Sequence, residues 1–149
     1  MYFFTILYLL ASQWSGLHEV NPDQICGKWI SPNRDFMVEC YKANDDTYHT
    51  KMVWFKKLEN KKRYNCEIPE DEWIGKDIVW GLTYNDNEWS GGELKDLKSC
   101  KTYDAYVTMS DKNSLTVTAY VVLRMLGEGM TFDRYFGKVP SLSEEISSF

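Results

Sequence analysis

The sequence predicts an all-β protein, an eight-stranded up-and-down antiparallel barrel built as one domain. After residue 20, short β-type runs alternate with turn residues, and no sustained helical period interrupts them. Aromatic residues make up 15 % of the chain, which favours a β-rich protein that packs large rings. Eight consecutive strands with short turns can close as a barrel, and closure leaves no exposed sheet edge. The 149 residues are enough to bury a core.

Each expected strand is bounded by turn residues such as Pro, Asn, Asp and Gly. One long connection, 57–76, separates the third and fourth strands. We expect a short helix within it, because Pro69 precedes an acidic run, and both favour a helix start. The eight expected strands are 27–31, 36–42, 48–56, 78–84, 89–95, 102–109, 115–125 and 130–136.

The turns also predict which side chains face the barrel interior, since side chains alternate along a strand and hairpin turns set the register. The expected pairs are Trp29–Val38, Phe36–Trp54, Tyr84–Trp89, Trp80–Glu93, Val107–Val117, Leu123–Phe132 and Val121–Arg134. The expected interior is Trp29, Phe36, Val38, Met52, Trp54, Val107, Val117, Val121, Leu123 and Phe132.

The stretch Trp89-Ser90-Gly91-Gly92 interrupts the fifth strand with two glycines. Glycines inside a strand indicate a bulge or a bend, so we expect the sheet to curl here. Trp89 is expected on the inward face.

The N-terminal run 2–11 is apolar, but it is too short to span a bilayer core of about 30 Å. Two interpretations remain for 1–16. An export signal suits the length and the small residues that follow, although no Lys or Arg precedes the run; the protein would then be periplasmic or secreted. A retained helix that caps the domain would imply a cytoplasmic protein. The barrel is expected over 25–137 and a flexible Ser- and Glu-rich tail over 138–149.

Four cysteines are compatible with two disulfides in an exported protein. The order of the turns places Cys66 and Cys100 at one barrel end and Cys26 and Cys40 near the other, which favours the pairs Cys26–Cys40 and Cys66–Cys100. Four free thiols are the alternative. The chain has no Cys-x-x-Cys pair and only two His, so we expect neither a metal site nor a cofactor.

The composition argues against several functions. A net charge of −5 makes nonspecific nucleic-acid binding unfavourable. The chain lacks Gly-x-Ser-x-Gly, a phosphate-binding loop and His-Glu-x-x-His, and we expect no enzyme.

Two hypotheses remain. In the first, the barrel mouth binds a small apolar or amphipathic ligand. In the second, the barrel is filled, and its outer surface near Tyr106 and Tyr120 binds a protein partner or another copy. The oligomeric state stays open. The candidate ligand-binding residues are Trp54, Trp80, Trp89, Tyr103 and Glu93.

Five blocks of the sequence occur in a characteristic order: Gly27-Lys28-Trp29, Lys51-Met52-Val53-Trp54, Ile78-Val79-Trp80-Gly81-Leu82, Trp89-Ser90-Gly91-Gly92 and Lys101-Thr102-Tyr103. Together they resemble a bacterial family labelled domain of unknown function 2147, over roughly 25–135. This family looks like a lipocalin-like (calycin) barrel. The resemblance therefore implies that Gly27 and Trp29 of the first strand and Arg134 of the last close one barrel end, with the guanidinium stacked on the indole. The family has no established activity and leaves the function open.

Overall fold

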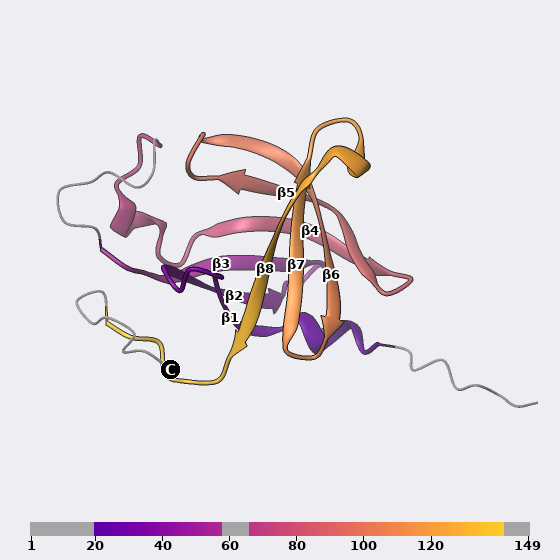
Figure 1. Cartoon of the computed structure of the whole chain (residues 1–149), viewed down its shortest axis with the longest axis horizontal. Coiled ribbons are helices and arrows are strands. Elements are labelled where there is room, and N and C mark those ends of the chain that lie inside the picture. The colour runs from indigo at the N-terminus through magenta and orange to yellow at the C-terminus, as the bar shows by residue number, and fades with distance from the viewer. Residues whose placement is uncertain (1–19, 58–65, 142–149) are drawn as a thin grey trace, which may run out of the picture.

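The computed structural model describes residues 20–57 and 66–141. Eight antiparallel strands form a closed barrel in chain order, and β8 returns to pair with β1 (Figure 1). This confirms the predicted fold class. The strands are β1 (Gly27–Ile30), β2 (Phe36–Lys42), β3 (Tyr48–Phe55), β4 (Asp77–Asn85), β5 (Glu88–Asp96), β6 (Lys101–Asp111), β7 (Ser114–Tyr120) and β8 (Glu128–Tyr135).

In the described part of the chain, helical structure consists of three 3-10 turns: η1 (Pro22–Ile25), η2 (Glu70–Trp73) and η3 (Arg124–Leu126). The short helix expected in the long connection is η2, a single four-residue turn. The expected export signal or capping helix at 1–16 and most of the tail lie outside the described residues.

The interior is packed around two Trp side chains. Trp29 and Trp89 are fully buried, and the inward positions of neighbouring strands surround them. Of the expected interior, Trp29, Val38, Met52, Val107 and Phe132 are buried in the main core, and Phe36 and Val117 are half-buried against it. The pairs Trp29–Val38, Trp80–Glu93 and Tyr84–Trp89 are confirmed.

The seventh strand was predicted too long: β7 ends at Tyr120 and not at 125. Val122 has a φ of 65°, in the left-handed region, which breaks the extended backbone there. Val121 and Leu123 are therefore 63 % and 52 % exposed, and their expected interior positions are wrong.

The last two expected pairs change as a result. Phe132 pairs with Leu115 instead of Leu123, and Arg134 lies opposite Trp29 of β1 instead of Val121.

A second correction concerns Trp54. The register shifts between Met37 and Val38, so Phe36 pairs with Phe55 and Met37 pairs with Trp54. The shift turns Trp54 out of the main core and into a separate cluster with Ile30 and Met37. The segment after β8 covers this cluster, and Trp54 Nε1 donates a hydrogen bond to the Ser141 carbonyl at 3.2 Å.

The two glycines of the fifth strand form the predicted irregularity. The β5–β6 register shifts between Trp89 and Gly92, and Gly91 has a φ of 75°. A Cβ on Gly92 would lie 2.5 Å from the Trp80 carbonyl oxygen, so β4 and β5 can approach this closely only at glycine.

Candidate functional site

One end of the barrel is closed by the N-terminal segment that carries η1. Buried or half-buried side chains from three strands donate hydrogen bonds to its backbone. Trp29 Nε1 donates to the Ile25 carbonyl at 2.8 Å, Trp89 Nε1 to Pro22 at 3.1 Å, and the Tyr84 hydroxyl to Val20 at 2.9 Å. These bonds satisfy the polar atoms of the rings and fix η1 across the barrel floor.

Arg134 completes this closure. Its guanidinium lies 4.1 Å from the centre of the Trp29 ring and donates to the carbonyls of Cys26 at 2.9 Å, Lys112 at 2.6 Å and Gln24. Burial lowers the pKa of the Arg134 guanidinium, and its N–H groups donate hydrogen bonds to the surrounding carbonyl oxygens. Gly27 makes room for the group, since a Cβ there would lie 2.9 Å from Arg134 Nη1. The geometry agrees with the structural role that the resemblance implied for Gly27, Trp29 and Arg134.

The opposite end, called here the open end, carries the β1–β2, β3–β4, β5–β6 and β7–β8 connections. A disulfide between Cys66 and Cys100, with Cα atoms 5.1 Å apart, joins two of these connections. Several inward-facing apolar side chains remain partly exposed here, although Trp73 and Leu97 of the connections are buried. The partly exposed side chains are Phe36, Leu94, Tyr103, Val117 and Met130, the last 40 % exposed.

The segment around η2 lies over the open end. A backbone hydrogen bond joins this segment to β3: the Gly75 amide donates to the Met52 carbonyl at 2.7 Å. Trp73 of η2 is buried in the main core, yet its Nε1 has no hydrogen-bond partner in the structure as described. A buried N–H without an acceptor is costly, so it marks a position where an acceptor from a bound molecule would be stabilised.

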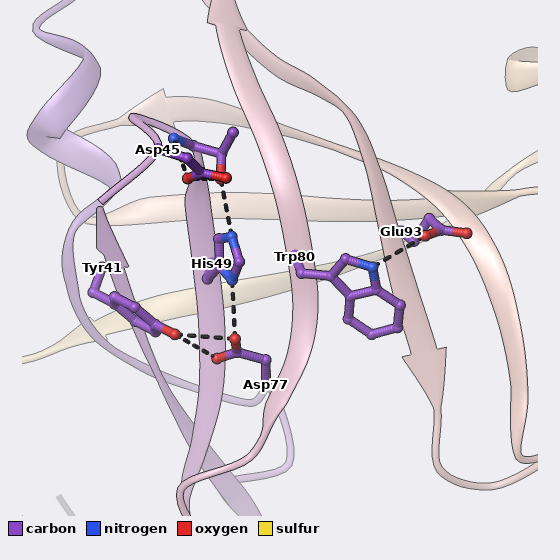
Figure 2. Close-up of polar contacts among 7 residues, drawn as sticks. Tyr41, Asp45, His49, Asp77, Trp80 and Glu93 are labelled. Atoms are coloured by element: carbon purple, nitrogen blue, oxygen red, sulfur yellow. Dashed lines mark hydrogen bonds and ion pairs between the residues drawn. The ribbon is translucent and has the colours of Figure 1, made fainter. Parts of the chain in front are cut away.

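The structure disperses the five candidate ligand-binding residues. Only Tyr103 lies inside the barrel at the open end. Trp54 belongs to the separate cluster with Ile30 and Met37, and Trp89 is fully buried and donates a hydrogen bond to the Pro22 carbonyl at the closed end. Trp80 and Glu93 pair on the outer face, where Trp80 Nε1 donates to Glu93 Oε2 at 3.0 Å (Figure 2).

A polar network that the sequence did not reveal lies on the outer face of β2, β3 and β4 (Figure 2). His49 Nδ1 lies 2.9 Å from Asp77 Oδ2, and His49 Nε2 lies 2.9 Å from Thr47 Oγ1. Asp77 also accepts a hydrogen bond from the Tyr41 hydroxyl at 2.8 Å. Burial and the bond to Asp77 raise the pKa of Tyr41 to about 12. The network therefore combines the residue types of a hydroxyl–His–carboxylate catalytic triad.

The partner of the Thr47 hydroxyl distinguishes this network from a triad. The hydroxyl donates its one proton to Asp45 Oδ1 at 2.7 Å. In a catalytic triad the hydroxyl of the nucleophile donates to the imidazole instead. The network joins β2, β3 and β4 through Tyr41, His49 and Asp77.

Cys26 and Cys40 are free thiols, whereas the sequence favoured a disulfide between them. Cys40 pairs with Gly27 in the β1–β2 register, so it lies beside Cys26. A hydrogen bond from the Cys40 thiol lowers the pKa of Cys26, and the same bond together with burial raises the pKa of Cys40. Of the two pairs that the sequence favoured, the structure contains Cys66–Cys100.

A hollow of about 280 Å³ lies where β1 and β8 meet, and three of its lining side chains are charged: Arg34, Asp133 and Arg134. Within residues 20–57 and 66–141, no group of three or more His, Cys, Asp or Glu side chains is placed to hold a metal ion. In the same residues, no helix has the length and apolar character needed to cross a membrane.

A closed eight-stranded antiparallel barrel, with an arginine stacked on the tryptophan of its first strand at the closed end, defines a lipocalin-like protein. The chain belongs to the bacterial family described as "Uncharacterized protein conserved in bacteria (DUF2147)", which it matches over residues 27–134.

Among solved structures, the fold is similar to that of protein HP1028 from the human pathogen Helicobacter pylori, described as belonging to the lipocalin family. The two share 15 % sequence identity with a TM-score of 0.55, over 75 % of this chain and 83 % of HP1028. No curated protein matches the chain.

Proposed function

We propose that the protein binds a small apolar or amphipathic molecule at the open end of its barrel, without catalysis. The partly exposed inward apolar side chains at the open end support this proposal. The floor is filled by Trp29 and Trp89 and closed by hydrogen bonds, while inward apolar side chains at the open end keep exposed surface. A bound apolar molecule would remove that surface from water, which is favourable.

The chemistry at the open end supports an amphipathic ligand with a hydrogen-bond acceptor. Trp73 Nε1 is a donor without a partner in the part of the chain that is described. An ester, carboxylate or hydroxyl oxygen of the ligand would accept from it. The Tyr103 hydroxyl, half-buried on the same side, adds a second polar contact.

We also propose that the protein works outside the cytoplasm, in the periplasm or as a secreted protein. Disulfides persist in oxidising compartments and are rare in the cytosol of most organisms. The Cys66–Cys100 disulfide at the open end supports this location.

The test is a ligand panel on the full chain, with fatty acids, lysophospholipids and haem, read by native mass spectrometry and by displacement of an environment-sensitive dye. The wild type should bind at least one lipid-like ligand saturably. Val117→Phe should weaken this binding at least tenfold, because the larger ring would occupy the position at the open end that the ligand is proposed to cover.

Thr116→Phe is the matched control, since it adds a ring on the same strand but on the outer face, and binding should persist. Circular dichroism would confirm that both variants fold. Absence of saturable binding to every ligand would refute the proposal, and so would equal binding by the two variants.

A further inference from the structure

The connection between β7 and β8 exposes five large apolar side chains within six residues. Val121, Val122, Leu123, Met125 and Leu126 are 52–86 % exposed, and Arg124 is the only polar residue among 121–126. We call 121–126 the apolar loop. Single exposed apolar residues are ordinary, but a contiguous group at this exposure marks an interaction surface.

The loop has a defined conformation, which its central arginine fixes. Arg124 forms an ion pair with Glu88 of β5 and lies 4.0 Å above the centre of the Tyr106 ring. Tyr120 approaches the same guanidinium at 6.0 Å from its ring centre. The charge of Arg124 is thus held against the outer face of β5 and β6, while the apolar side chains of the loop stay exposed to solvent. In Figure 1 the loop stands beyond the ends of β7 and β8.

The shape and size of the loop indicate its partner. A stable protein interface needs about 20–30 residues a side, and a projecting loop of six residues is far smaller. A bilayer, in contrast, accepts an apolar projection without shape complementarity. Tyr and Arg are the residue types that suit the headgroup level, and Tyr106, Tyr120 and Arg124 lie directly behind the loop.

Charge indicates the lipid class. The chain carries a net charge of −5, and the exposed residues of the open-end connections have both signs, as with Lys98 and Glu67. The driving force is therefore burial of apolar side chains in the interfacial region of the bilayer, and not attraction to anionic headgroups.

We propose that the apolar loop docks the protein peripherally on a zwitterionic phospholipid surface. The β7–β8 connection leaves the barrel at the open end, and Arg124 ties it to Glu88 and Tyr106 on the outer face of β5 and β6. The docking rests on the loop alone and does not depend on the ligand proposal.

The test is flotation of the full-length protein with phosphatidylcholine vesicles. The wild type should float with the vesicles, and the double variant Met125→Asp/Leu126→Asp should show at least a tenfold lower partition coefficient. Phe136→Asp is the matched control, because Phe136 is 79 % exposed but lies outside the loop; this variant should float like the wild type. Flotation should persist when salt is raised to about 0.5 M, where charge attraction is screened.

Several results would overturn the docking proposal. One is a wild type that stays with the unbound fraction. Another is equal flotation of the wild type and the loop variant, which would place any lipid contact elsewhere in the chain. A concentration-dependent mass in light scattering that the loop variant abolishes, without flotation, would assign the loop to self-association. Val117→Phe should float normally, so failure of ligand binding and failure of docking are separate outcomes.

Discussion

At the scale of single residues, the Gly-x-Trp pattern of β1 is explained by the space that Arg134 needs. Gly27 has a φ of 125° and faces the guanidinium, so a side chain there would meet both an unfavourable backbone conformation and a contact of 2.9 Å. The Trp29 ring needs the same guanidinium on its face. A glycine, an indole and an arginine far apart in sequence thus form one closure.

Gly27→Ala should lower the free energy of unfolding by about 1–3 kcal/mol, the usual cost of local backbone strain, plus the displaced Arg134 contact. Urea denaturation measures it. Gly75→Ala is the control, because Gly75 also has a positive φ, 82°, but a Cβ there meets nothing within 4 Å. Equal losses in the two variants would show that the contact with Arg134 contributes little.

The hydroxyl of Tyr41 gives a second prediction at this scale. Its pKa is raised to about 12 in the folded protein, first by burial and then by the bond to Asp77, against 10.0 ordinarily. Folding therefore favours the protonated form. This contribution to stability is fully present below pH 10 and is lost as the pH rises through 12.

Urea denaturation between pH 8 and about 12 measures this contribution. The wild type should lose stability across the upper part of the range, and Tyr41→Phe should flatten that loss. Part of the loss of stability should remain in Tyr41→Phe, because burial and the bond to Asp23 also raise the pKa of Tyr48. An unchanged slope in Tyr41→Phe would contradict the assignment.

At the scale of strands and turns, the sequence predicted the register wherever a short polar turn joins two strands. The turns at 85–87 and 111–113 place Tyr84 opposite Trp89 and Val107 opposite Val117, as the structure has them. The turns carry Asn and Asp, whose side chains favour such conformations, so local chemistry is sufficient there.

The prediction was wrong for the end of β7 and for the β2–β3 register, because both depend on contacts between residues distant in sequence. The run 121–126 is apolar and β-branched at its start, which is typical of a strand. What ends β7 is the left-handed Val122, with Arg124 held by Glu88 and Tyr106 of other strands. The register shift between Met37 and Val38, which places Trp54 outside the main core, likewise has no glycine or proline nearby that would predict it.

The pairing of β1 with β2 yields a prediction about thiols. Cys26 lies beside Cys40, and their hydrogen bond lowers the pKa of Cys26 and raises that of Cys40. Native protein treated with iodoacetamide should therefore be alkylated first at Cys26, and at a lower pH than an ordinary thiol. Peptide mapping by mass spectrometry identifies the site.

In denaturant without reductant, two thiols should react, and four after reduction, because Cys66 and Cys100 are joined. No reactive thiol before reduction would show that Cys26 and Cys40 also form a disulfide, as the sequence favoured. Alkylation of Cys40 ahead of Cys26 would contradict the direction of the hydrogen bond.

At the scale of the whole molecule, the barrel is built differently at its two ends. The closed end is held by η1, Arg134 and two buried indoles. The open end depends on a covalent link between connections. The sequence predicted which cysteines share that end, because turn order alternates between ends. It could not predict the candidate site, which depends on how far Phe36, Val117 and Met130 are covered by residues distant in sequence.

This asymmetry predicts what the Cys66–Cys100 disulfide does. Cys66→Ser/Cys100→Ser opens a loop whose ends are 34 residues apart, which should cost about 3 kcal/mol of folding free energy. The loss of stability should be confined to the open end.

Hydrogen exchange measured by mass spectrometry should speed up in η2 and the β5–β6 turn, while β1 and the strands at the closed end keep their protection. Cys26→Ser, which removes a thiol at the closed end, should leave exchange at η2 unchanged. Uniform acceleration over all eight strands would mean that the two ends unfold as one unit, and that the open end has no independent freedom to admit a ligand.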